Sequence, residues 1–307
     1  MLYLLSTTTF SIMKYFNRSI TLLLGTLALL PISYIDSTLK NEMTSDVENS
    51  VLWKVSHPDS DLESYLLGTI HLMCEEEFFI PEKVLNIMDK VDEVSFEVNL
   101  SDAEEIASAI PYIMGKKKLT ETLTESQQTE VDEILRSHLN LTINDLDAYT
   151  ITAVWTMIID ASLPCESKTP YEMELLKLAQ ERSLKISGLE KISTQFECLN
   201  NAYNTEEYIN QIKLLPDYQD IFLTAFEDYK NEDIQAVGEK YTSEKFMDKN
   251  AFYWLLEERN NRWAKIIPHK TQKNSTLFAV GAAHLIGEDG LIHLLEMEGY
   301  NVEPVFE

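Results

Sequence analysis

Two short segments near opposite ends of the chain share one pattern, and this repeat restricts the fold more than any other feature. Residues 67–72 read LGTIHL and residues 280–285 read VGAAHL, so each places a histidine three positions after a glycine at the end of an apolar run. With nine glycines and six histidines in 307 residues, about 0.2 chance matches are expected. Two matches therefore indicate two strand ends of related design.

The glycines and histidines of these segments suit the carboxyl ends of β-strands. Gly68 and Gly281 let the backbone turn or let a neighbouring segment approach closely. His71 and His284 then lie near the strand ends, and we predict that both imidazoles point into one crevice. The remaining histidines lie in turn or helix-surface contexts and are interpreted as structural: His57, His138, His269 and His293.

Alternating strand and helix signals predict an α/β fold with a mostly parallel or mixed central sheet flanked by helices. A hairpin is expected at 51–72, a helix follows Pro81, and the strand 93–100 completes a βαβ unit with parallel strands. Residues 171–190 are typical of a helix and a strand. A strand, a helix and a closing strand over 275–305 mirror the first module.

The region before the last module has a helical pattern rich in tyrosine, phenylalanine and glutamate. We predict a helical insert at about 194–267, between the N- and C-terminal sheet modules. The domain as a whole is expected to span 51–307, after a linker at 38–50.

The N-terminus has the pattern of a secretory signal peptide. Lys14 and Arg18 precede the apolar stretch 20–32, which is shorter than the about 20 residues that span a membrane. We predict a signal peptide at 1–37, with Met13 as an alternative start, and hence a periplasmic or extracellular protein. An uncleaved N-terminal anchor is the alternative, and it is the only membrane contact expected.

The charge balance restricts the partners. Lys and Arg number 25 against 51 Asp and Glu, a formal charge of −26, which repels nucleic acid and anionic membrane surfaces. The cysteines are Cys74, Cys165 and Cys198. A Cys165–Cys198 disulfide and three buried thiols both remain open, and a cysteine nucleophile at Cys74 is not favoured.

Two carboxylates occupy positions that call for a cation. Glu97 lies inside an apolar strand, and Glu190 ends the segment ISGLE. A buried carboxylate is costly unless a cation or a hydrogen-bonding cluster compensates it. Together with His71 and His284, these glutamates form a candidate metal-and-base set. The alternative is a polar cluster that only braces the strand ends.

A third group of polar residues follows in the segment ERNNRW. Arg259 and Arg262 are three residues apart and share one helical face, next to Asn260. They could bind a substrate carboxylate or neutralise the two glutamates. Ordinary surface ion pairs are the alternative.

The segments YLLGTIHL, IPEKV, VSFEVNL, SGLEKISTQ, ERNNRW and VGAAHLIGEDGLIHLLEMEGYNVEPV resemble the TraB/GumN family, to which the Tiki proteins belong. The resemblance implies an α/β core shared with erythromycin-esterase-like and ChaN-like proteins. It marks as motif residues Gly68, His71, Glu97, Glu190, Arg259, Asn260, Arg262, Gly281 and His284. Glu172 stands where many bacterial relatives carry aspartate; it could shift a ligand or cap a helix, and it is left outside the predicted set.

Tiki proteins are metal-dependent peptidases, so the resemblance implies an exported metal-dependent hydrolase that acts on a peptide or protein. In this hypothesis the histidines and one or both glutamates bind Mn, Co or Zn, and a remaining glutamate acts as general base. The arginines would position a carbonyl or carboxylate. The predicted catalytic residues are Glu97, Glu190, Arg259, Asn260 and Arg262. The alternative is a non-catalytic regulatory protein that binds a peptide, haem or metal in the same crevice.

Overall fold

The computed structural model describes residues 48–163, 165–242 and 244–306. The predicted signal peptide, the alternative start at Met13 and most of the predicted linker lie outside the described residues. Within the described ranges, no helix combines the length and the apolar character needed to cross a membrane.

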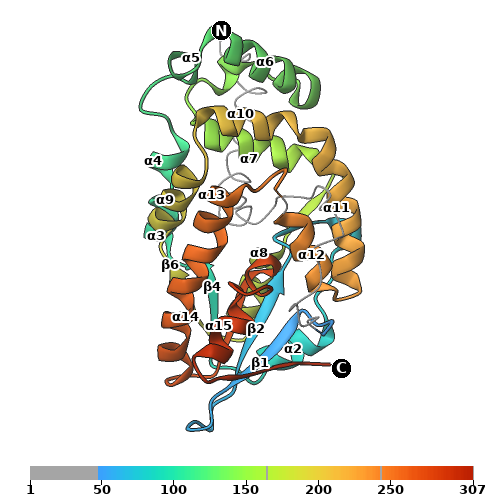
Figure 1. Ribbon diagram of the computed structural model, residues 1–307, viewed down its shortest axis with the longest axis vertical. Helices are drawn as coiled ribbons and strands as arrows, with labels where there is room; N and C mark the ends of the chain where they lie inside the picture. The colour runs from blue at the N-terminus through green and yellow to red at the C-terminus, as the bar shows by residue number, and fades with distance from the viewer. Residues whose placement is uncertain (1–47, 164, 243, 307) are drawn as a thin grey trace.

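A six-stranded mixed sheet with the order β6-β4-β7-β2-β1-β8 forms the centre of the molecule (Figure 1). Strands β6, β4, β7 and β2 run parallel, and β1 is antiparallel to both β2 and β8. The predicted α/β class is therefore confirmed, although β7 lies between β2 and β4. The strands are β1 Leu52–Ser56, β2 Ser64–Thr69, β4 Glu93–Val98, β6 Lys185–Glu190, β7 Thr276–Gly281 and β8 Asn301–Pro304.

The three inner parallel strands are buried along their whole length. Every residue of β2, β4 and β7 is buried, as expected for strands whose two faces are both covered. Helices α14 (Glu258–Thr271) and α15 (Leu291–Met297) pack against each other in front of the sheet. The apolar runs of the sequence therefore become the core of a sheet that is covered on both faces.

Helices fill the two long connections between strands. Those between β4 and β5 are α3 Ala103–Ala107, α4 Ile110–Ile113, α5 Leu119–Thr122, α6 Glu125–Leu139 and α7 Ile151–Ser162, with the 3-10 turn η3 Ile143–Leu146. Those between β6 and β7 are α9 Ile192–Ala202, α10 Thr205–Lys213, α11 Leu215–Lys230, α12 Ile234–Tyr241, α13 Lys249–Phe252, η4 Tyr253–Glu257 and α14. The second set covers the predicted insert, and the domain limits themselves stay a prediction.

Helices from both connections form one helical layer at the end of the molecule away from the sheet. Helix α10 contacts α6 and α7, and α11 contacts α7 (Figure 1). Helix α6 begins with a reciprocal cap, in which the Thr124 hydroxyl accepts from the Gln127 backbone and the Gln127 side chain accepts from the Thr124 N–H. On the other side of the layer, α12 contacts the turn that carries His284.

A small second sheet was not predicted. Strands β3 (Leu72–Cys74) and β5 (Lys168–Pro170) pair antiparallel. A disulfide joins Cys74, at the end of β3, to Cys165, just before β5, and their Cα atoms are 5.7 Å apart. Cys198 is buried and free. The possible Cys165–Cys198 pairing is therefore wrong, because Cys165 lies beside β3 and not beside α9. The helices α2 Glu82–Met88 and α8 Tyr171–Glu181 and the turns η2 Glu75–Glu77 and η5 Ala282–His284 complete the described elements.

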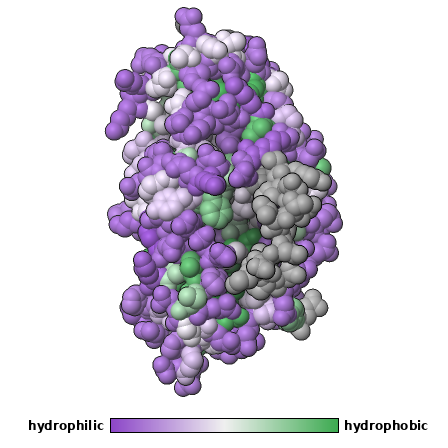
Figure 2. Space-filling model, in the orientation of Figure 1, coloured by the Kyte–Doolittle hydropathy of each residue, from purple (hydrophilic) through white to green (hydrophobic). Residues whose placement is uncertain are grey.

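The surface on the face in Figure 2 is mostly hydrophilic. On the face in Figure 2, most of the coloured side chains are hydrophilic, and the hydrophobic ones form small separate areas. The large exposed hydrophobic residues are scattered over several elements: Ile110, Met173, Leu223, Tyr253, Met297 and Phe306.

Candidate active site

The two repeated segments meet at one edge of the sheet. Strands β2 and β7 are parallel neighbours, with Gly68 opposite Val280 and Thr69 opposite Gly281. His71 follows the end of β2, and His284 ends the turn η5 after β7. The predicted convergence of the two imidazoles therefore follows from the pairing of these strands.

Gly68 lies where the two segments touch, and a side chain there would be crowded. A Cβ at this position would lie 3.2 Å from Ala282 Cα and 3.0 Å from Leu285 Cδ1. The Gly68 carbonyl accepts a hydrogen bond from the Tyr229 hydroxyl at 2.9 Å. The glycine thus allows the turn that carries His284 to pack directly on β2.

Glu97 lies between the two imidazoles. Its Oε1 is 3.9 Å from His71 Nε2 and 3.8 Å from His284 Nε2, and it accepts a hydrogen bond of 3.0 Å from the Gly281 N–H. His71 is 4% exposed and His284 is 0% exposed. Three potential ligand atoms from three strand ends therefore face one buried point.

Each imidazole is held through its Nδ1 atom. His71 Nδ1 is 2.5 Å from Glu172 Oε1, and His284 Nδ1 is 2.6 Å from Asn260 Oδ1. The Asn260 amide nitrogen donates to the carbonyls of His284 and Asp289, so its oxygen must accept and His284 Nδ1 must carry the proton. The lone pair of His284 is then on Nε2, the atom that faces Glu97.

Arg259 is the cation of the predicted set. It is 0% exposed, and its Nη2 lies 2.5 Å from Glu97 Oε2 and 2.8 Å from Glu190 Oε1. Its Nη1 is 3.1 Å from His284 Nε2, and its guanidinium stacks on Trp263 at 4.5 Å. The π-helical turn η4 directly precedes this helix, a deviation that is frequent at functional sites.

Glu190 contacts arginines and not histidines. One oxygen accepts from Arg259 Nε at 2.9 Å, and the other is 3.3 Å from Arg262 Nη2. Arg262 also pairs with Glu258 at 2.8 Å. The neutralising role foreseen for the arginines is therefore observed. The assignment of Glu190 as a metal ligand stays a prediction, and it requires these contacts to change.

Two polar residues of the site were not in the predicted set. Glu172, in the first turn of α8, holds His71, and Gln195 Nε2 donates to Glu97 Oε2 at 3.1 Å. The sequence singled out Glu172 because many bacterial relatives carry aspartate at this position. Its contact with His71, 101 positions away, could not be read from the sequence. Gln195 gave no signal beyond its place in SGLEKISTQ.

The environment shifts the pKa values of the ionisable groups of the site in different directions. Burial favours neutral Glu97, but Arg259 and the two imidazoles outweigh it and hold its pKa at about 2. Burial and then Arg259 push the pKa of His284 well below its usual value. Burial opposes charge on His71, yet Glu172 and Glu97 raise its pKa. Burial also raises the pKa of Glu190. At neutral pH, Glu97 is a carboxylate and His284 a neutral base.

The residues are of the types that bind a divalent ion, although they do not form a ligand shell. Among the described residues, no three His, Cys, Asp or Glu side chains already have the arrangement of a metal site. However, His71 Nε2 is buried without a hydrogen-bond partner in the part of the chain that the structure describes, and it faces a carboxylate, an arrangement that suits an imidazole ligand. His284 Nε2 would have to exchange Arg259 for the ion.

The charge count also favours a cation. With neutral imidazoles, the buried carboxylates of Glu97, Glu172 and Glu190 face the guanidiniums of Arg259 and Arg262. One negative charge is left without a partner cation, and burying such a charge is costly. A divalent ion, or a proton on His71, would compensate it.

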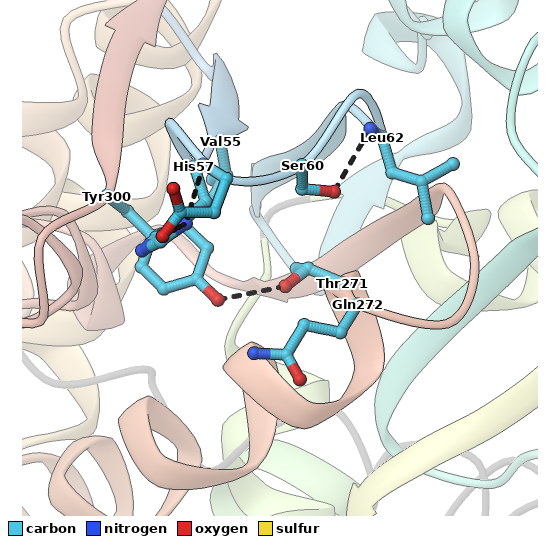
Figure 3. Close-up of a pocket in the computed structure, with 8 residues that line it drawn as sticks. Val55, His57, Ser60, Leu62, Thr271, Gln272 and Tyr300 are labelled. Atoms are coloured by element: carbon cyan, nitrogen blue, oxygen red, sulfur yellow. Dashed lines mark hydrogen bonds and ion pairs between the residues drawn. The ribbon is translucent and has the colours of Figure 1, made fainter.

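A separate cavity lies at the opposite end of the hairpin β1–β2 (Figure 3). It has a volume of about 180 Å³, and its wall includes His57, Thr271 and Tyr300. Its polar groups bond locally: the Asp59 N–H donates to His57 Nδ1 at 3.1 Å, and the hydroxyls of Thr271 and Tyr300 are 3.2 Å apart. The cavity contains none of the predicted site residues, and the structural interpretation of His57 stays a prediction.

Comparisons with known proteins agree with the resemblance seen in the motifs. The sequence profile of the TraB/PrgY/gumN family matches residues 51–304. A protein of Amphimedon queenslandica named Metalloprotease TIKI homolog is 23% identical over an alignment 316 positions long, which covers 83% of this chain and 61% of the relative. Metalloprotease TIKI2 of Danio rerio is 22% identical over 324, with the same coverage. The chain thus spans about three fifths of these relatives. No solved structure matches the chain.

Proposed function

Because the chain belongs to the TraB/PrgY/gumN family, we propose that it is an exported metal-dependent hydrolase that cleaves peptide bonds. The observation that carries this proposal is the approach of two imidazole Nε2 atoms, from two separate strand ends, to the same oxygen of Glu97. The names of two relatives, both metalloproteases, support the same class of reaction.

In this proposal His71, His284 and Glu97 hold a divalent ion, with Mn, Co and Zn as candidates. Nitrogen and carboxylate donors suit ions of this kind. When bound, the ion supplies a water of lowered pKa and polarises a carbonyl oxygen. Glu172 and Asn260 orient the two imidazoles through their Nδ1 atoms.

The remaining charged residues are Arg259 and Glu190, whose side chains are buried, and Arg262, whose side chain is partly exposed. Arg259 keeps Glu97 ionised and in place. Arg262 is one third exposed in its side chain, which suits contact with a carbonyl or carboxylate of a substrate. Glu190, beside both arginines, is the carboxylate proposed as general base, and its function requires Arg262 to turn toward the substrate.

Export and the substrate class are parts of the same proposal. A disulfide between Cys74 and Cys165 supports an oxidising compartment, in keeping with the basic and apolar N-terminal segment. The strongly acidic composition argues against nucleic acid as a substrate. A peptide or protein remains the substrate class of choice, with membrane contact only through an uncleaved N-terminal segment.

The test compares metal content and hydrolysis in matched variants of the full chain. The protein is stripped with a chelator, reloaded with Mn²⁺, Co²⁺ or Zn²⁺, and assayed on a mixed peptide library. We expect His71→Ala and His284→Ala to abolish cleavage, whereas His269→Ala and His293→Ala, at exposed helix positions, keep it. Cleavage that survives both site substitutions, or that is indifferent to the chelator, would reject the proposal. Tight metal binding without cleavage of any peptide would favour a binding protein instead.

A further inference from the structure

The contact between Glu172 and His71 carries an inference beyond the predicted site. Glu172 Oε1 lies 2.5 Å from His71 Nδ1 and 2.5 Å from Thr69 Oγ1, and all three residues are buried. We propose that Glu172 is a positioning residue, which fixes the ring and the tautomer of His71 so that Nε2 presents a lone pair to the space beside Glu97. The proposal rests on the proposed function for its consequence in metal binding, and it has a readout without metal as well.

The small sheet formed by β3 and β5 positions Glu172 beside His71. Strand β3 starts directly after His71, and β5 ends directly before α8, which carries Glu172 in its first turn. The Tyr171 N–H donates to the His71 carbonyl at 2.8 Å, which extends the β3–β5 pairing by one residue. The disulfide from Cys74 to Cys165 closes the far end of this sheet.

The backbone at His71 has a rare conformation that the contacts around it maintain. His71 has a φ of +21°, a conformation that L-residues adopt rarely and that persists only where surrounding contacts enforce it. The turn redirects the chain from β2 into β3 and aims the ring at Glu97. The Glu172 carboxylate then fixes the ring about its remaining torsions, because the hydroxyl of Thr69, the last residue of β2, donates to the same carboxylate oxygen.

The hydrogen-bond chemistry decides the tautomer. A carboxylate only accepts, so a neutral His71 beside Glu172 carries its proton on Nδ1 and its lone pair on Nε2. His71 Nε2 has no hydrogen-bond partner among the described residues. His284 is held by a neutral amide oxygen instead, so the two imidazoles differ in basicity, and His71 is expected to be the stronger ligand.

Three variants separate positioning from simple structural support. Glu172→Ala removes the acceptor, and Glu172→Gln keeps its length and an amide oxygen. Glu174→Gln makes the same charge change at a less buried position in the same first turn of α8. Loss of a partner of this type lowers metal affinity about 10- to 100-fold. We expect that loss for Glu172→Ala, a smaller loss for Glu172→Gln and none for Glu174→Gln, as measured by Co²⁺ titration of the full chain with calorimetry and visible absorption.

A second measurement works without any metal. Nitrogen NMR of the imidazoles, recorded at an alkaline pH where His71 has lost its second proton and with the His71 signals assigned by their loss in His71→Ala, should show an Nδ1–H tautomer in the wild type and a mixture in Glu172→Ala. If the alanine variant does not fold, as judged by its thermal transition, Glu172→Gln carries the Co²⁺ comparison, and its tautomer should stay Nδ1–H because the amide oxygen still accepts. A purely structural role would lower the melting temperature and leave the Co²⁺ spectrum and the tautomer unchanged, which would overturn the inference.

The two proposals fail in different ways. If the wild type binds none of the three ions, the metal-dependent function is rejected, and the NMR comparison alone decides the role of Glu172. If the wild type binds metal and Glu172→Ala binds it equally well with the same tautomer, the positioning role is rejected and the function stands.

Discussion

Replacing Arg259 with methionine tests whether one guanidinium allows two carboxylates to remain buried. Arg259 is fully buried, and it contacts Glu97 and Glu190 at 2.5 Å and 2.8 Å. Methionine has a similar length but leaves both carboxylates without their shared cation. Breaking a buried pair in this way costs about 3–5 kcal/mol, so we expect Arg259→Met to lower the free energy of unfolding at pH 7 by about that amount.

The loss should depend on pH in a defined direction. In the wild type the folded pKa of Glu97 is about 2, below its ordinary 4.5, so its contribution is present above pH 4.5 and is lost toward pH 2. In Arg259→Met, burial acts without the guanidinium and raises the folded pKa of Glu97 above the unfolded one. That variant therefore gains stability as the pH falls from 7 through the raised pKa, and the two stability curves approach each other.

Urea unfolding followed by circular dichroism at several pH values measures both effects. Lys265→Met, an exposed cation on the same helix, serves as the control and should change stability by less than about 0.5 kcal/mol. Adding Glu97→Gln and Glu190→Gln to Arg259→Met should recover part of the loss, because the stranded charges are removed. A loss below about 1 kcal/mol at pH 7, or one that the glutamine substitutions do not reduce, would refute the reasoning.

Three further predictions concern the scaffold. Reduction of the Cys74–Cys165 disulfide, which spans 91 positions, should destabilise the fold by about 2–5 kcal/mol, and a thermal melt with and without reductant checks this; an unchanged melt would contradict it. Gly68→Ala should cost about 1–3 kcal/mol in urea unfolding, because its Cβ would lie 3.2 Å from Ala282 Cα; a neutral effect would show that the turn can shift. Burial favours neutral Glu93, but its lysine and serine partners hold its pKa at about 2 against an ordinary 4.5. The stability advantage of wild type over Glu93→Gln should therefore be full above pH 4.5 and vanish as the pH falls toward 2, and a gap that persists at pH 2 would exclude this linkage.

The local sequence pattern was sufficient to predict the strands of the core and the strand ends that carry the site. Largely apolar runs identified strands β2 and β7, because strands covered on both faces bury the side chains on both. Strand β4 is equally buried but alternates apolar residues with the polar residues Glu93, Ser95 and Glu97. The repeated glycine and histidine identified the two strand ends. Parallel strands in one sheet bring such ends to one edge, so the meeting of His71, Glu97 and His284 could be predicted before any coordinate was known.

Only the tertiary structure decided which distant groups contact these residues. Glu172 reaches His71 across 101 positions, and Cys74 pairs with Cys165 across 91. Both contacts depend on the register of the short strands β3 and β5, whose three residues each carry too little pattern to be recognised. The sequence left open whether the arginines would meet the glutamates, and Arg259 contacts both because α14 packs beside β6. Side-chain partners of this kind are set by packing between segments, and the sequence of either segment alone does not contain that information.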